Sequence, residues 1–143
     1  MNQVVVKQEK SGYQIVEAYK SLRTNLQFCG EDKKVIAVTS CTPNEGKSSV
    51  SMQLGISLAE SGKRVILIDA DLRKSVLLGR TKTQKSVRGL AHFLSGQATL
   101  EDVICSTNVK NFYMIYSGPF PPNPAELLGG KNFRSLLNAL RKV

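Results

Sequence analysis

Two apolar runs on either side of a glycine-bearing turn and a helix restrict the fold more than any other feature of this sequence. The runs are VIAVT (residues 35–39) and VILI (residues 65–68), each with the length of a buried strand. Between them, the turn SCTPNEGKSS (residues 40–49) leads into an apolar helical pattern that ends at Gly62. Strand, helix and strand in this order form a βαβ unit, with parallel strands and a right-handed crossover. The sequence therefore predicts an α/β fold, a parallel sheet flanked by helices.

The rest of the chain supplies further elements of the same domain. Residues 12–29 have apolar side chains at helical spacing and predict an amphipathic opening helix. We expect one domain over residues 1–143, with the opening helix at about 12–29 and a core over 33–143. Within that core we predict two short helices (GLAHFLSG and TLEDVIC), a strand at FYMIY (112–116), a rigid PFPPNP loop, and closing helices in AELL and FRSLLNALRKV.

Length and composition exclude several classes of protein. A chain of 143 residues suffices for one domain with a hydrophobic core, and its 41% hydrophobic and 22% charged residues are typical of soluble globular proteins. No apolar run approaches the roughly 18 residues of a membrane span, and the N-terminus does not resemble a signal peptide. Cys29, Cys41 and Cys105 are odd in number and far apart, which favours reduced cytosolic thiols over disulfides or a zinc site.

The net charge of +9 is concentrated in residues 73–88, where no acidic residue occurs. One interpretation is a solvated loop without a dedicated partner. The other is a surface for anionic lipid, an acidic protein or another polyanion. Nucleic acid is not favoured, because there is no evident reading helix and no interleaved aromatic residues. The basic residues are Arg73, Lys74, Arg80, Lys82, Lys85 and Arg88.

The turn between the two apolar runs matches most of the sequence pattern of a P-loop, a loop that binds nucleotide phosphates. Gly46, Lys47 and Ser48 fit the pattern, whereas Cys41 stands at its first glycine. Gly46 allows close approach of the backbone, and the free N–H groups of the first helical turn attract anions. Asn44 tolerates a left-handed conformation better than most residues. We expect Lys47 to reach the outer phosphates and Ser48 to ligate magnesium; the alternative is an ordinary strand-to-helix turn with an exposed lysine.

Two carboxylates follow the second apolar run. Asp69 and Asp71 are two residues apart, so they share one face if the extended chain continues through Asp71. The carboxyl end of a parallel strand is where open α/β sheets bind ligands. One carboxylate can hold magnesium while the other orients or deprotonates an attacking hydroxyl. The alternative is a pair of aspartates that cap the turn.

Taken together, these segments resemble the bacterial tyrosine kinases that control capsule and exopolysaccharide export, which are P-loop ATPases with deviant phosphate loops. TSCTPNEGKSS (39–49) is similar to their Walker A loop, and ILIDADLRK (66–74) to their Walker A′ motif. EAYKSLRTNLQF (17–28) resembles their opening helix, and GLAHFLSGQATLEDVI and SGPFPPNPAELL resemble later landmarks.

The resemblance implies autophosphorylation of tyrosines from ATP and Mg²⁺, with catalysis by Lys47, Asp69 and Asp71 and metal binding by Ser48, Asp69 and Asp71. It implies a subunit ring in the full-length form, a membrane activator or chain-length determinant protein as partner, and a cytoplasmic location at the inner face of the membrane. The family's Glu-x-x-Arg-x-x-Arg interface reads Glu17, Lys20 and Arg23 here, and Lys20 lacks the rigid fork of arginine; local ion pairs on an exposed helix are the alternative. The implied nucleotide-binding residues are Pro43, Asn44, Glu45, Gly46, Lys47, Ser48 and Ser49.

Two family features are missing between residues 1 and 143. The Walker B strand, which ends in an aspartate and follows the segment similar to PNPAELL, is not found, and tyrosines 13, 19, 113 and 116 are scattered instead of gathered in a tail. We therefore expect a kinase fragment, with a fold incomplete at the C-terminus and little activity of its own. The alternatives are a nucleotide-switched ATPase of the partitioning or septum-positioning type and a non-catalytic adaptor for a membrane partner.

Overall fold

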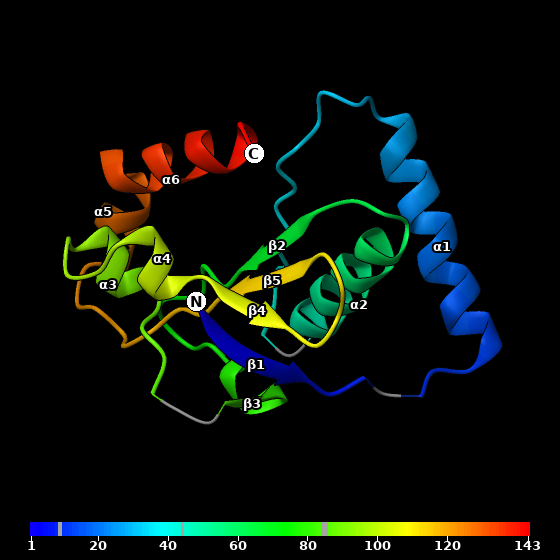
Figure 1. Ribbon diagram of the computed structural model, residues 1–143, viewed down its shortest axis with the longest axis horizontal. Helices are drawn as coiled ribbons and strands as arrows, with labels where there is room; N and C mark the ends of the chain where they lie inside the picture. Colours follow the sequence, from blue (N-terminus) through cyan, green and yellow to red (C-terminus); the bar gives the residue numbers. More distant parts are fainter. Residues whose placement is uncertain (9, 44, 84–85) are drawn as a thin grey trace.

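A five-stranded sheet separates two layers of helices in the computed structural model, which describes residues 1–8, 10–43, 45–83 and 86–143 (Figure 1). The strands are β1 (Asn2–Val6), β2 (Val65–Ile68), β3 (Thr81–Thr83), β4 (Cys105–Thr107) and β5 (Phe112–Ile115). The helices are α1 (Tyr13–Phe28), α2 (Lys47–Glu60), the 3₁₀ turn η1 (Leu78–Arg80), α3 (Leu90–Leu94), α4 (Leu100–Val103), α5 (Pro124–Gly129) and α6 (Lys131–Arg141).

The strand order is β2-β5-β4-β1-β3, and the sheet is mixed. The pairs β2–β5 and β1–β4 are parallel, whereas β4–β5 and β1–β3 are antiparallel. The predicted α/β class is correct, and the parallel pairing places β2 beside β5 with Ile68 opposite Ile115. β2 forms one edge of the sheet.

Side chains of the sheet alternate between two hydrophobic cores, as the two-residue period of a strand requires. In β5, Phe112 and Met114 pack on one face with Met52 and Ile56 of α2. Ile115 points to the other face, where it joins a core built from α3 to α6. α1 packs outside α2 and has no buried residue of its own. None of the helices in the described ranges is both long enough and apolar enough to cross a membrane.

Most predicted elements are present. The opening helix, the helix after the phosphate loop, the strands at VILI and FYMIY, the two short helices and the closing helices all form near their expected bounds. The strands β1, β3 and β4 were not predicted. Each is short, and β1 pairs with β4 across about a hundred residues of sequence, as the partners Asn2 and Cys105 show.

The predicted strand at residues 35–39 is wrong for this structure. In the described part of the chain the segment pairs with none of the five strands, and Val35, Ile36 and Val38 are 43%, 46% and 38% exposed. A strand needs a partner for its backbone N–H and C=O groups. β2 has an unpaired edge, but the segment does not lie on it.

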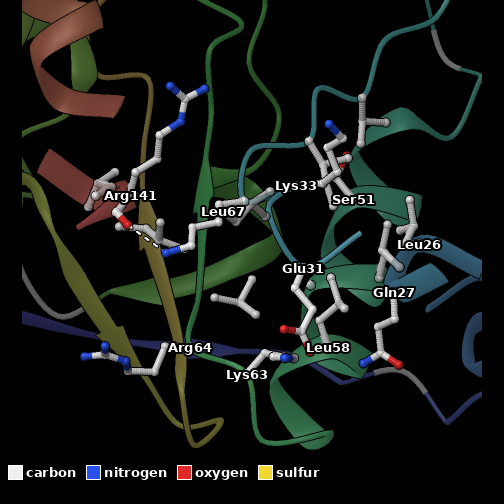
Figure 2. A pocket seen from close by; sticks show the side chains of 18 of the residues that line it. Leu26, Gln27, Glu31, Lys33, Ser51, Leu58, Lys63, Arg64, Leu67 and Arg141 are labelled. Carbon is white, nitrogen blue, oxygen red and sulfur yellow. Dashed lines mark hydrogen bonds between the residues drawn. The ribbon is translucent and has the colours of Figure 1, made fainter. Parts of the chain in front are cut away.

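A cleft separates this unpaired segment from β2. Two adjoining cavities of about 710 and 600 Å³ run along β2, both lined by Ile36 and Val38 on one side and by Ile66 and Leu67 on the other. Figure 2 shows the first cavity between Leu67 and the side chains of α1 and α2. The end of α6 lies at its rim, where Lys34 Nζ donates a 3.1 Å hydrogen bond to the carbonyl oxygen of Arg141.

Candidate functional site

The phosphate loop ends in a left-handed glycine that starts α2. Gly46 has φ 82° and is the N-cap, and Val50 N donates to its carbonyl at 2.9 Å. A side chain here would be strained by the positive φ, although no atom lies within 4 Å of an added Cβ. The backbone at Gly46 is therefore open to close approach by another group; its part in phosphate binding stays a prediction. Asn44 lies outside the described residues.

Asp69 and Asp71 lie just beyond the end of β2. Asp69 still belongs to the sheet, because its N–H donates to the Ile115 carbonyl at 2.9 Å, and its side chain is only 6% exposed. Its Oδ1 accepts from Asp71 N at 3.1 Å, and its Oδ2 accepts from the Ser75 hydroxyl. Asp71 is half-buried, and its Oδ1 caps the following turn by accepting from Lys74 N at 2.9 Å. Asp71 therefore caps this turn, as the alternative interpretation of the two aspartates predicted.

Burial raises the pKa of Asp69 above its usual value, and repulsion from Asp71 adds to this effect. Hydrogen bonds from Ser75 and Asp71, together with the charge of Lys47, oppose the shift. A buried carboxylate with this balance favours binding of a proton or a cation. On the loop, hydrogen bonds from Thr42 hold the pKa of Glu45 below its usual value. Thr42 therefore favours the ionised form of Glu45.

One cavity brings the predicted catalytic and metal-binding residues together. Lys47 and Ser48 from α2 and Asp69 and Asp71 from the end of β2 line the cavity of about 600 Å³. Carboxylate and hydroxyl oxygens are ligands that Mg²⁺ prefers, and a lysine at a helix N-terminus suits phosphate. In the described residues, no three or more His, Cys, Asp or Glu side chains are grouped so that they alone could hold a metal ion. A divalent ion at this position would rely on two carboxylates and Ser48, with phosphate oxygens completing its ligands.

Pro43, Glu45 and Ser49, which were also predicted to bind the nucleotide, are not among the residues that line this cavity. Pro43 and Glu45 are exposed, and Ser49 is half-buried in the first turn of α2. The Ser49 hydroxyl accepts a hydrogen bond from Arg80 of η1. Ser75 and Arg80 are site neighbours that the sequence did not identify individually. Arg80 belonged to the basic segment flagged by its charge, but no pattern indicated which of the basic residues would reach the loop.

The residues predicted to form a subunit interface make contacts within the chain. Lys20 Nζ lies 3.3 Å from Glu17 Oε1, an exposed i, i+3 pair of the local kind. Arg23 Nη1 donates to the Ser57 carbonyl at 2.8 Å and to the Ser57 hydroxyl at 3.3 Å, which fastens α1 to α2. On the same helix Ile15 and Val16 are 51% and 39% exposed, so an apolar strip of α1 faces solvent.

Comparison with known proteins gives consistent matches. A family model described as "AAA domain" matches residues 33–139. Tyrosine-protein kinase CpsD of Streptococcus agalactiae is 42% identical over 127 residues, 89% of this chain and 56% of that protein. Tyrosine-protein kinase YwqD of Bacillus subtilis is 39% identical over 122 residues, 84% of this chain and 51% of that protein.

Solved structures agree with these matches. The kinase domain of the Escherichia coli tyrosine kinase ETK has a TM-score of 0.83 at 29% identity, and the match covers 97% of this chain and 64% of that one. The chain spans about half the length of the curated relatives it matches.

Proposed function

Because this chain belongs to the bacterial tyrosine kinases of the AAA-domain P-loop proteins, we propose that it is the nucleotide-binding part of an ATP-dependent protein-tyrosine kinase. The process it serves is capsule or exopolysaccharide synthesis and export. The observation that carries this proposal is the single cavity lined by Lys47, Ser48, Asp69 and Asp71. A lysine, a helix N-terminus and two carboxylates are the groups that phosphoryl transfer requires.

Each of these four residues has a role in the proposed reaction. Lys47 and the N–H groups of the first turn of α2 bind the phosphates and offset their charge. Ser48, Asp69 and Asp71 are the residues that would hold Mg²⁺, which would supply charge neutralisation to the phosphates when bound. The γ-phosphoryl group passes from ATP to a tyrosine hydroxyl, ADP leaves, and one of the two aspartates takes the hydroxyl proton.

The oligomeric state of the protein and its location in the cell are also proposals. The exposed apolar strip of α1 supports a homo-oligomer in the longer polypeptide, with Glu17, Lys20 and Arg23 on the same helix. We propose that this assembly lies at the inner face of the membrane through an activator or chain-length determinant protein. The adaptor alternative predicts the same membrane contact without nucleotide binding.

Catalysis by residues 1–143 alone is expected to be weak. The unpaired segment 35–39 leads into the phosphate loop, so the loop lacks the support of a paired strand. Phosphoryl transfer depends on positioning, and each 1.4 kcal/mol lost in the transition state costs about tenfold in rate. We expect weak Mg·ATP binding at best and no measurable autophosphorylation from this chain.

The test compares this chain with a longer polypeptide that includes a Walker B strand and a tyrosine-rich tail. We expect phosphotyrosine after incubation with Mg·ATP only in the longer polypeptide, and Lys47→Ala should abolish it. Lys110→Ala is the matched control, because Lys110 is exposed and is not among the residues that line the cavity. The next residue, Asn111, accepts a hydrogen bond from Val65 N at the start of β2, whereas Asp69 follows the end of β2. Nucleotide binding without phosphotyrosine in the longer polypeptide would favour the nucleotide-switched ATPase. Strong phosphotyrosine on residues 1–143 would contradict the need for the additional strand.

A further inference from the structure

The side chain of Arg80 contacts the start of α2 and thereby places a second positive charge, besides that of Lys47, beside the phosphate loop. Its Nη1 donates a hydrogen bond to the hydroxyl of Ser49, the third residue of α2. The first turn of α2 is where the free backbone N–H groups lie, so Arg80 reaches the part of the loop that binds phosphate. Lys47 reaches the same turn from within the helix.

The backbone on both sides of Arg80 is anchored. Leu77 is 4% exposed in the same core as Met52 and Ile56, and its carbonyl accepts from Arg80 N at 3.0 Å. On the other side, Thr81 is 8% exposed, pairs with Val6 of β1 and shares a hydrogen bond with the buried Tyr116 hydroxyl. These anchors restrict the guanidinium of Arg80 to the neighbourhood of α2, although the side chain itself is exposed.

The chemistry of the contact leaves Arg80 available to an anion. Two ion pairs, Lys20–Glu17 and Lys33–Asp32, are found in the ranges that the structure describes, and neither includes Arg80. A neutral hydroxyl is a weaker partner for a guanidinium than a carboxylate or phosphate, which can accept two parallel hydrogen bonds. The same segment also contributes Ser75, which donates to Asp69. The segment from 75 to 80 therefore touches both sides of the proposed nucleotide site.

We propose that Arg80 is a further phosphate-binding residue, whose guanidinium bonds to the polyphosphate of the bound nucleotide from its position on Ser49. The inference rests on the proposed function, since it requires a nucleotide in the loop. It gives part of the basic segment 73–88 a specific partner, where charge alone left a solvated loop or a polyanion surface as the alternatives. If Arg80 binds the polyphosphate, bound nucleotide should also hold residues 75–80 against α2.

The experiment measures binding of Mg·ATP, Mg·ADP and adenosine to the 143-residue chain by calorimetry at nucleotide concentrations up to saturation. Arg80→Ala is expected to weaken Mg·ATP binding by about tenfold, the usual loss for one charge-assisted hydrogen bond. Adenosine binding should not change, and Arg80→Lys should lose less because it keeps the charge without the fork. Arg88→Ala is the matched control, because its Nη1 donates to the Gln97 carbonyl at 2.8 Å and not to α2.

Two further readouts separate this role from a merely structural one. Loss of a phosphate contact should make Mg·ATP affinity less dependent on salt, whereas loss of a structural contact should lower only the melting temperature of the free protein. If Lys47→Ala abolishes binding while Arg80→Ala binds Mg·ATP as tightly as Arg88→Ala, Arg80 is no phosphate ligand and the proposed function stands. If the unsubstituted chain shows no binding, the same comparison is made in the longer polypeptide of the kinase test. Absence of Mg·ATP binding there too would mean that the nucleotide site fails and this inference with it.

Discussion

VILI at residues 65–68 and VIAVT at residues 35–39 have nearly the same composition, yet only the first is a strand. β2 pairs along its whole length with β5 and is half-buried, and Asp69 at its end is held by the sheet. Residues 35–39 run as a coil and not as a strand (Figure 1). Their apolar side chains line the other side of the cleft and are partly exposed. An apolar run thus becomes a strand only where a partner accepts its backbone hydrogen bonds.

This difference divides the proposed nucleotide site into two parts. The part built from α2 and the end of β2 is anchored by two cores, and it carries Lys47, Ser48, Asp69 and Asp71. The part that leads into the loop, residues 35–43, has no such anchor. We therefore expect substitutions in the first part to change the stability of the fold and substitutions in the second part to leave it nearly unchanged.

The largest expected effect is the contrast between two isoleucines. Ile66→Ala removes a side chain packed against the second core and should lower the free energy of unfolding by about 2 kcal/mol. Ile36→Ala, at a residue that is 46% exposed, should change it by less than about 0.5 kcal/mol. Urea denaturation of both variants checks this. Equal losses would mean that segment 35–39 is packed as firmly as β2.

A somewhat smaller effect is expected at the contact between α1 and α2. Arg23→Ala removes hydrogen bonds to the Ser57 carbonyl and hydroxyl and should cost about 1–2 kcal/mol of unfolding free energy. Lys20→Ala is the control, since it removes only an exposed ion pair. If light scattering showed that Arg23→Ala lowers the molecular mass of an oligomer without loss of stability, the residue would belong to an interface between subunits instead.

Asp69→Asn should stabilise the free protein while it disables the site. Burial raises the pKa of Asp69, so the folded state holds its proton more tightly than the unfolded state does. The stability that comes from protonation is complete below the unfolded pKa and is lost as the pH rises through the higher folded pKa. The asparagine variant should therefore melt at a higher temperature at neutral pH, and this advantage should shrink as the pH falls towards the unfolded value. A variant that is less stable at neutral pH would show that the ionised carboxylate stabilises the fold.

The smallest expected effect concerns the loop thiol. Cys41 and Cys29 are both exposed and free, and Cys105 is buried. We expect Mg·ATP to slow alkylation of Cys41 modestly by covering the loop, while Cys29 on the far end of α1 reacts at an unchanged rate. Mass spectrometry after timed labelling measures both. Identical Cys41 rates with and without nucleotide would place the bound phosphates away from this residue.

The sequence allowed most of this arrangement to be predicted, because its signals are local. Gly46 and Lys47 before a helical pattern, and Asp69 and Asp71 after an apolar run, are recognised from their neighbours in the chain. The structure brings Lys47 and the two aspartates to one cavity. Whether residues 35–39 form a strand could not be predicted from the local sequence, because strand formation depends on a pairing partner elsewhere in the chain. The strands β1 and β4 were missed for the related reason that they form through distant pairing, and the Arg80–Ser49 contact depends on how η1 is anchored.

Hydrogen exchange of the backbone amides shows whether the segment leading into the phosphate loop, residues 35–39, is an apolar run that forms no strand because it has no partner. In the 143-residue chain, the amides of β2 that bond to β5 should exchange slowly, and those of residues 35–39 should exchange at nearly the rate of an unstructured peptide. In the longer polypeptide with the additional strand, residues 35–39 should become as protected as β2. Strong protection of residues 35–39 in the 143-residue chain, or none in the longer polypeptide, would contradict the account.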